Sequence, residues 1–204
     1  MVENWKKVSS ENVNDIIDVD VLDSTSLELL KPDMRPEAYI EVLSSAEKWT
    51  GAVAVMARAL PRREAVWWAC SCASLMDGLS ENKEEILALK MAEKWVHKPT
   101  EENRRNAFLQ AQKSDEPSAG TLSCMAVAFS GGKLAVSKDQ SVDLDASVFT
   151  EIVAAVVMIS ASENDGLHIN QRLKQFLQNA KDIACGGNGK PETELTRIMQ
   201  RYTG

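Results

Sequence analysis

One segment of the chain is apolar on almost every side of a predicted helix, and this constrains the fold more than any other feature. Residues 61–78 open with a proline and close with a glycine, which suit the two ends of a helix. From Ala65 to Met76 only Ser71 and Ser74 interrupt a run of apolar residues. Because a helix that is apolar all round must be buried all round, we expect 61–78 to be the central helix of the protein.

The rest of the chain after residue 35 is also divided into helices. Apolar residues recur every three or four positions between prolines, glycines and capping residues, and Ser80 and Thr100 are expected as N-caps. The predicted helices cover residues 36–60 with an interruption at Thr50–Gly51, 61–78, 80–98, 100–111, 117–130, 145–162, 168–185 and 191–202. We therefore predict an all-α protein, a compact bundle of about eight helices, with residues 36–204 as a single helical domain.

The first 35 residues differ from the rest in charge and pattern. Residues 1–50 hold 11 Asp and Glu against 5 Lys and Arg, a net charge of −6 out of −7 for the whole chain. Ile17, Val19 and Val21 alternate with aspartates, and this period of two predicts either a strand or an extended acidic arm with apolar anchors. We expect residues 1–35 to form an acidic N-terminal arm. It either lies across the protein's own helices or presents these three residues to a partner.

Composition excludes several classes of function. The longest apolar run, residues 148–161, is shorter than the roughly 18 residues of a membrane span and contains a glutamate. The first residues lack the apolar stretch of a secretory signal. A net charge of −7 and a pI near 5.0 argue against a broad nucleic-acid interface. We therefore expect a cytoplasmic protein that binds neither membranes nor nucleic acid and keeps its four cysteines reduced.

No motif for a metal, a phosphate or a catalytic nucleophile meets its geometric requirements. Cys70 and Cys72 would point about 200° apart on a helix, so they cannot bind one ion. The glycine-rich residues 186–190 resemble part of a phosphate-binding loop, but Pro191 stands where that loop needs a hydroxyl residue. We therefore expect no cofactor and no metal, and we predict that the protein is not an enzyme.

Two kinds of side chain remain as candidates for binding. Trp67 and Trp68 diverge by about 100° on the central helix, so Trp68 is expected in the core, whereas Trp67 either packs on a second layer or anchors an interface. The basic residues occur in pairs, which would bind a small anion or an acidic partner if they meet in space. For Arg104 and Arg105 the alternative is a solvated helix face, with Arg105 paired to Glu101. The basic candidates are Arg62, Arg63, Arg104 and Arg105.

Several segments resemble a family of uncharacterised bacterial proteins. The segments are LPRREAVWWAC at 60–70, AEKWV at 92–96, PTEENRR at 99–105, AVAFSGG at 126–132 and RLKQFLQNAKDIACG at 172–186. The most specific is PRREAVWW, and the resemblance spans residues 36–190. It implies an association with type VI secretion loci and brings no catalytic residues with it.

Three hypotheses of function follow. The first is a non-enzymatic helical protein-interaction module, an accessory or adaptor protein of a bacterial secretion system, as the resemblance implies. The second is a protein that binds a small molecule or an anion in an arginine-lined pocket, which requires the arginines to converge. The third is an enzyme with a dispersed site, which requires His97 or His168 in a concave pocket beside Asp, Glu or Cys.

Overall fold

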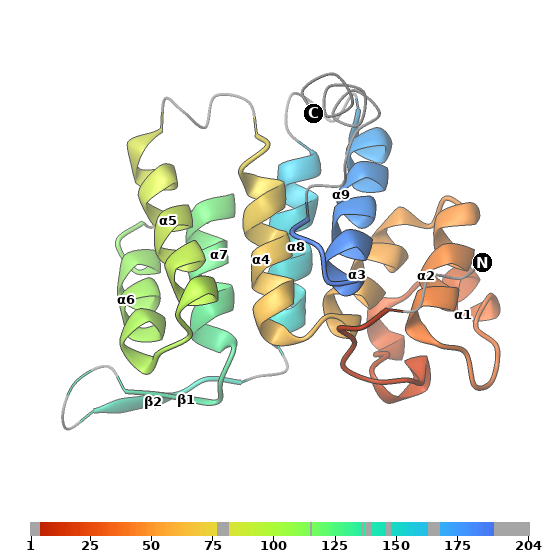
Figure 1. Cartoon of the computed structure of the whole chain (residues 1–204), viewed down its shortest axis with the longest axis horizontal. Coiled ribbons are helices and arrows are strands. Elements are labelled where there is room, and N and C mark those ends of the chain that lie inside the picture. Colours follow the sequence, from red (N-terminus) through yellow and green to blue (C-terminus); the bar gives the residue numbers. More distant parts are fainter. Residues whose placement is uncertain are drawn as a thin grey trace, which may run out of the picture.

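Helices dominate the computed structural model of the chain (Figure 1). The structure describes residues 5–76, 82–114, 116–135, 137, 140–145, 148–162 and 168–189. The α-helices are α1 Ser24–Glu28, α2 Pro36–Ser45, α3 Trp49–Ala59, α4 Arg62–Ala73, α5 Lys83–His97, α6 Glu101–Ala111, α7 Ala119–Phe129, α8 Phe149–Ala161 and α9 Ile169–Ala184. Two 3-10 helices, Val13–Asp15 and Val19–Val21, precede them, and the strands β1 Lys133–Ala135 and β2 Ser141–Asp143 pair antiparallel. The predicted helical bundle is confirmed, while the helix predicted over 191–202 lies outside the described residues.

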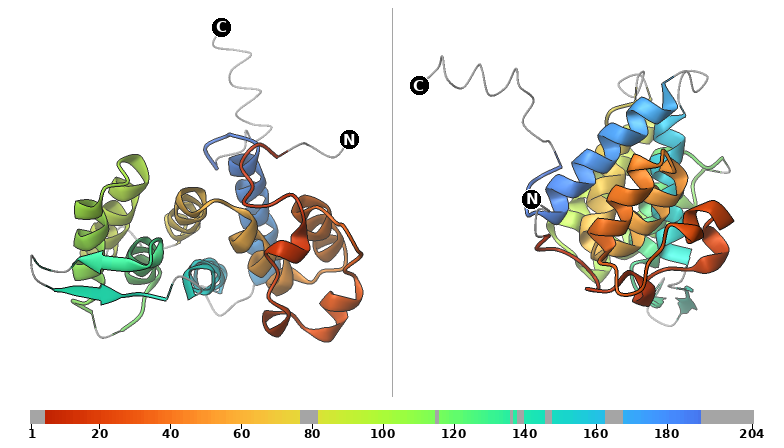
Figure 2. Two further views of the ribbon diagram at one scale, coloured as in Figure 1. Left: turned by 90° about the horizontal axis from the view of Figure 1, so that it is seen from below. Right: turned by 90° about the vertical axis from the view of Figure 1, so that its right-hand side faces the viewer.

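The apolar helix lies in the middle of the molecule, as its composition predicts. α4 and α8 stand between α5–α7 on one side and α2, α3 and α9 on the other (Figures 1 and 2). Trp68 and Cys70 are fully buried, and the Trp68 indole N–H donates to the Phe176 carbonyl oxygen of α9 at 2.8 Å. α4 ends at Ala73. The predicted end at Gly78 lies outside the described part of the chain.

Side-chain caps begin the helices on the α5–α7 side. The Thr100 hydroxyl accepts a hydrogen bond from the Asn103 N–H at 3.2 Å, as predicted for α6. The cap of α5 is Asn82, whose side chain accepts from the Glu85 N–H at 3.1 Å. Ser80, the cap expected for that helix, lies outside the described residues. Such caps satisfy N–H groups that have no partner inside the helix.

The predicted interruption at Thr50–Gly51 is wrong, because both residues belong to the first turn of α3. The chain turns earlier, at Glu47, whose φ of 56° is the left-handed conformation that often ends a helix. Gly51 does not end a helix; its lack of a side chain allows α3 to pack closely against Ser26. A Cβ there would lie 3.1 Å from the Ser26 hydroxyl oxygen.

Residues 5–35 fold onto the helices, and the strand alternative is wrong. The Ser9 N–H donates to the Ala59 carbonyl oxygen at 2.8 Å, and the Val13 N–H donates to that of Met34 at 2.9 Å. Trp5 and Val13 are buried in the same core as the helices. The N-terminal residues therefore run along one side of α3 (Figure 2) as short 3-10 turns.

α8 is rich in apolar residues and packs against several other helices. It contacts α3, α4, α7 and α9. Its 13 residues are fewer than the roughly 20 needed to cross a bilayer. None of the helices in the described ranges combines the length and the apolar composition of a membrane span.

Candidate functional site

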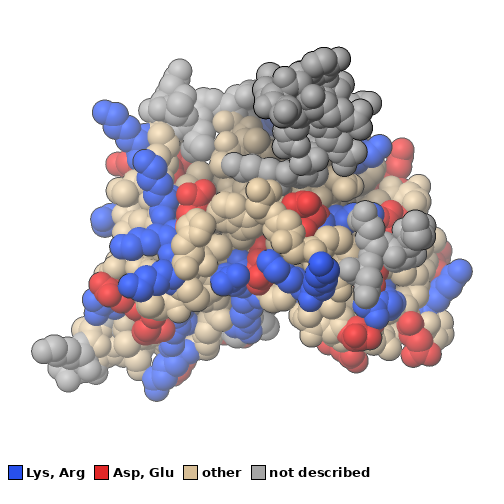
Figure 3. Space-filling model, in the orientation of Figure 1, with Lys and Arg blue, Asp and Glu red and all other residues tan. Residues whose placement is uncertain are grey.

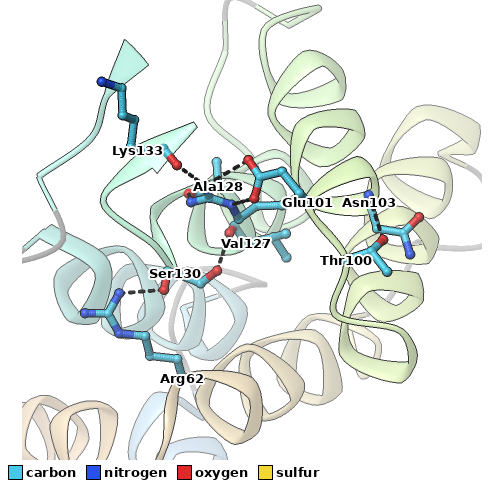
Figure 4. Close-up of polar contacts among 9 residues, drawn as sticks. Arg62, Thr100, Glu101, Asn103, Val127, Ala128, Ser130 and Lys133 are labelled. Carbon is cyan, nitrogen blue, oxygen red and sulfur yellow. Dashed lines mark hydrogen bonds and ion pairs between the residues drawn. The ribbon is translucent and has the colours of Figure 1, made fainter. Parts of the chain in front are cut away.

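Two of the four candidate arginines lie at the end of α7 and bind main-chain carbonyl groups there (Figure 4). The Arg104 guanidinium donates to the carbonyl oxygen of Ala128 at 3.1 Å and to that of Lys133. Arg62 donates to the carbonyl oxygen of Ser130. The last carbonyl groups of a helix have no partner within it, and cations near them are favoured by the helix dipole. These two side chains therefore hold the end of α7 and the start of β1.

The expectation of a solvated face is wrong for Arg104. Only 7% of this residue is exposed, and its Nε and Nη2 donate to the Glu101 carboxylate at 2.8 and 2.9 Å. The physical reason is that α6 packs on α7 and β1, which places Arg104 between them. The expected pair of Glu101 with Arg105 is not formed, and Arg105 Nε is buried without a hydrogen-bond partner among the described residues.

Three other candidates come together in one pocket, which we name the Trp67 pocket. Arg63 and Trp67 reach it from α4, and His97 reaches it from the end of α5. Its volume is about 290 Å³. The lining residues are Lys7, Arg63, Glu64, Trp67, Val96, His97, Ile183, Gly187 and Asn188. The pocket therefore joins the N-terminal residues, α4, α5 and the end of α9.

The Trp67 pocket combines cations with an aromatic wall. Glu64 Oε1 lies 3.4 Å from Lys7 Nζ and 3.5 Å from Arg63 Nη2, so one carboxylate holds both cations. The Trp67 indole N–H donates to the Asn188 carbonyl oxygen at 2.8 Å. Because this polar group is satisfied by the protein, the half-buried ring is left to contact a ligand through its apolar surface.

One of the two histidines has the surroundings that the enzyme hypothesis requires. His97 is exposed, its ring centroid lies 5.8 Å from that of Trp67, and Glu64 lines the same pocket. A catalytic base also needs a group that orients it. No hydrogen bond joins His97 to an acidic side chain or a cysteine within the described ranges. His168 is exposed, at the residue before α9.

The apolar residues of the N-terminal arm do not share one face. Ile17 is half-buried against the core. Val19 is 57% exposed and Val21 is 38% exposed, and Asp18 and Asp20 lie beside them in the chain. Ile17 therefore contributes to packing, whereas the two valines remain available on the surface.

A second pocket contains an arginine that the sequence analysis missed. Arg58 lies in the last turn of α3, and its side chain is only 9% exposed. It lines a pocket of about 540 Å³, which we name the Arg58 pocket. The lining residues are Ser9, Asp15, Ile16, Asp18, Arg58, Leu60, Pro61, Arg62, Phe149 and Thr150. The sequence does contain a feature that points to Arg58: it is the single charged residue in the apolar run AVAVMARAL. A charged residue in such a run is either exposed or paired with buried partners.

The four arginines of the anion hypothesis do not line one pocket. Arg62 lines the Arg58 pocket, and Arg63 lines the Trp67 pocket. Arg104 is bonded to Glu101 and to main-chain carbonyl groups. Within the described ranges, these four residues therefore do not converge on one of these pockets.

The buried cysteines are protonated thiols. Cys70, Cys72 and Cys124 are buried, and burial raises their pKa values, that of Cys124 to about 12. Thiols of this kind react slowly, because the thiolate is the reactive form. Within the part of the chain that the structure describes, no group of three His, Cys, Asp or Glu is placed to hold a metal ion.

Comparison with known proteins identifies a family. No curated protein matched the chain, and no solved structure did. The sequence model of a family of unknown function (DUF6931) matches residues 39–184, which include Arg58, Arg63, Trp67 and His97. The N-terminal residues that complete both pockets precede this span. Because the match covers well over half of the 204 residues, the chain belongs to the DUF6931 family.

Proposed function

We propose that the protein is a helical protein-interaction module that binds an acidic segment of a partner, with the Trp67 pocket receiving one anchor side chain. The observation that carries this proposal is the combination of a half-buried tryptophan with the cations of Arg63 and Lys7 in one pocket. Trp and Arg are enriched among the few residues that supply most of the binding energy of an interface.

The size of the pocket is compatible with one anchor side chain. Small-molecule sites usually enclose about 300–1,000 Å³, and the Trp67 pocket encloses about 290 Å³. A single aromatic or branched side chain can enter a space of this size. Val96 and Ile183 offer apolar contact to its body, and Arg63 and Lys7 offer charge to acidic groups beside it.

A row of lysines on α5 supports an acidic partner. Lys90, Lys94 and Lys98 are exposed; Lys90 and Lys94 are one turn apart on one side of α5, and Lys98 is the residue that follows the helix. None of them forms an ion pair within the described ranges. Figure 3 shows Lys and Arg side chains gathered over the half of the molecule that contains α5 and α6. Because His97 lies on the same side of α5 and lines the Trp67 pocket, the row leads to that pocket.

The proposal includes the accessory or adaptor role in a bacterial secretion system that the sequence resemblance implies. An adaptor binds its partner without chemically changing it. Interfaces of this kind have a buried centre with a polar rim around it. The Trp67 pocket and the lysine row together have this composition. The accessory role itself rests on the resemblance.

The proposal is tested by comparing partners captured from the native cells by the tagged chain and by its variants. Trp67→Ala removes the aromatic wall, and the double variant Lys90→Glu, Lys94→Glu reverses the charge of the row. We expect both to lose the same partner, with recovery reduced about tenfold or more, since truncating an anchor residue costs about 2 kcal/mol or more. Trp67→Phe keeps an aromatic ring and should retain part of the binding.

Two substitutions elsewhere serve as matched controls. Val142→Ala alters an exposed apolar residue of β2, and Lys31→Glu reverses an exposed charge near the N-terminus. Both should capture the partner as the unaltered chain does, and circular dichroism should show every variant folded. Equal recovery by Trp67→Ala and Val142→Ala would contradict the proposal. So would a partner that depends on the lysine row and not on Trp67.

A further inference from the structure

We propose that the Arg58 pocket binds a small organic phosphate. This site is separate from the Trp67 pocket and does not depend on the function proposed for it. Its volume of about 540 Å³ lies within the range of about 300–1,000 Å³ that small-molecule sites occupy. The N-terminal residues, the corner between α3 and α4 and the start of α8 bound it, and they lie together at the lower edge of Figure 1.

Arg58 has hydrogen-bond donors that the protein leaves unused. Its Nη1 donates to the Ala54 carbonyl oxygen at 3.3 Å, and its Nη2 lies 3.8 Å from a carboxylate oxygen of Asp18. The Arg58 side chain makes no other hydrogen bond or ion pair within the described ranges. A guanidinium has five N–H donors, and buried donors are nearly always satisfied. The side chain is 9% exposed and lines the pocket, so its remaining donors can bond to an acceptor there.

Arg62 adds a second guanidinium to the same pocket. Its Nη1 donates to the Ser130 carbonyl oxygen, and its Cζ lies 5.5 Å from the centroid of the Phe149 ring. These two contacts fix its position at the pocket wall. Planar guanidinium groups match the oxygen atoms of a phosphate in pairs of parallel hydrogen bonds. Two of them in one pocket therefore indicate an anion with several oxygen atoms.

The start of α8 forms one wall of the site that the two arginines line. Phe149 and Thr150 line the pocket, and the N-cap residue Val148 makes no side-chain hydrogen bond to the first turn. The first N–H groups of a helix have no partner within it and favour a negative charge nearby. The Thr150 hydroxyl is a further donor.

The chemistry of the walls indicates the class of ligand. A phosphate has three terminal oxygen atoms and close to two negative charges at neutral pH, so it can accept from both guanidinium groups and from α8 at once. A carboxylate has two oxygen atoms and one charge. Leu60, Pro61 and Phe149 offer apolar contact to the rest of the ligand. We therefore expect a phosphomonoester with an apolar or aromatic body.

Asp18 competes with such a ligand. Its carboxylate neutralises part of the Arg58 charge at 3.8 Å and lines the same pocket, and Asp15 lines it as well. A bound phosphate has to replace this interaction or be repelled by it. Removing the charge of Asp18 should therefore strengthen phosphate binding, whereas removing the charge of an arginine should weaken it.

Isothermal titration calorimetry of the full chain with phenyl phosphate tests the site. We expect saturable binding, tighter than that of inorganic phosphate or benzoate. Arg62→Gln should weaken it about tenfold or more, because a charge-assisted hydrogen bond is lost. The variant also loses the contacts of Arg62 with the Ser130 carbonyl oxygen and the Phe149 ring, so its stability has to be measured beside its affinity. Asp18→Asn should tighten binding several-fold.

Lys113→Gln removes an exposed positive charge away from the pocket and is the control, with binding expected to equal that of the unaltered chain. Thermal unfolding should show that all variants are folded. The proposal is overturned if phenyl phosphate does not bind saturably, or if Arg62→Gln binds it as tightly as the unaltered chain. Equal affinity for benzoate and phenyl phosphate would also overturn it, since the site would then not select phosphate.

Discussion

At the residue scale, Arg104 joins three parts of the chain through one side chain. It donates to the Glu101 carboxylate and to the carbonyl oxygens of Ala128 and Lys133. A Cβ placed on Gly131 would lie 2.6 Å from Arg104 Nη1, which is closer than atoms can approach without moving. Gly131 is therefore required by this contact.

Gly131→Ala should lower the free energy of unfolding by about 1–3 kcal/mol, because its methyl group would displace a buried guanidinium from its carbonyl acceptors. Gly132→Ala is the matched control. A Cβ on Gly132 meets nothing closer than the Leu144 carbonyl oxygen at 4.0 Å, so its effect should stay within about 0.5 kcal/mol. Denaturant unfolding measures both. Equal losses in the two variants would show that the contact with Arg104 is not the cause.

At the scale of elements, side-chain caps organise the N-terminal residues. The side chains of Asn12, Asp18 and Asp23 each accept a hydrogen bond from a backbone N–H two or three residues further on. Such local bonds offer the backbone an alternative to a strand ladder, which explains why a period-two pattern forms short helical turns here. Hydrogen bonds from the side chain of Thr25 and the backbone N–H of Ser26 lower the pKa of Asp23 to about 2.

The cap of α1 should therefore depend on pH at the acidic end of the scale. A carboxyl group whose pKa is lowered on folding stabilises the fold above its ordinary value of 3.8, and this contribution is lost as the pH falls toward about 2. NMR titration of the Ser26 amide should follow a pKa near this lower value. Asp23→Asn keeps an acceptor and should abolish the titration while α1 persists. A midpoint near 3.8 would contradict the prediction.

At the scale of the whole molecule, one core runs from the N-terminal residues to α9. Val13 is fully buried in the same cluster as Trp68 and Ile183. Val13→Ala should therefore destabilise the entire chain, by about 1.5–3 kcal/mol, because a cavity opens in the shared core. Val19→Ala, at a valine that is 57% exposed, should change the stability by no more than about 0.5 kcal/mol.

Unfolding in guanidinium chloride, followed by tryptophan fluorescence and by circular dichroism, measures the effect of both substitutions. A shared core predicts one transition at which the two signals coincide. If Val13→Ala instead produced an early partial transition, the N-terminal residues would be unfolding separately from the helices.

The sequence identified some residues of the candidate sites and missed others, and the difference has a physical reason. Trp67 was identified as either a packing residue or an anchor, and in the structure its ring is half-buried at a pocket. Arg104 looked like a surface residue, because its sequence neighbours are polar and the partners that bury it lie on α7 and β1. Arg58 was overlooked, because nothing near it in the sequence shows that Arg62 and Phe149 line the same pocket.

The sequence by itself determined the helical class, the central position of α4 and the cap of α6. Apolar periodicity and capping act within one or two turns of the chain, so they can be read locally. Only the tertiary structure decided which side chains meet. Trp67 bonds to a residue 121 positions away, and Arg62 to one 68 positions away. Contacts over such separations depend on how the helices pack, and the pattern along any one helix does not contain that information.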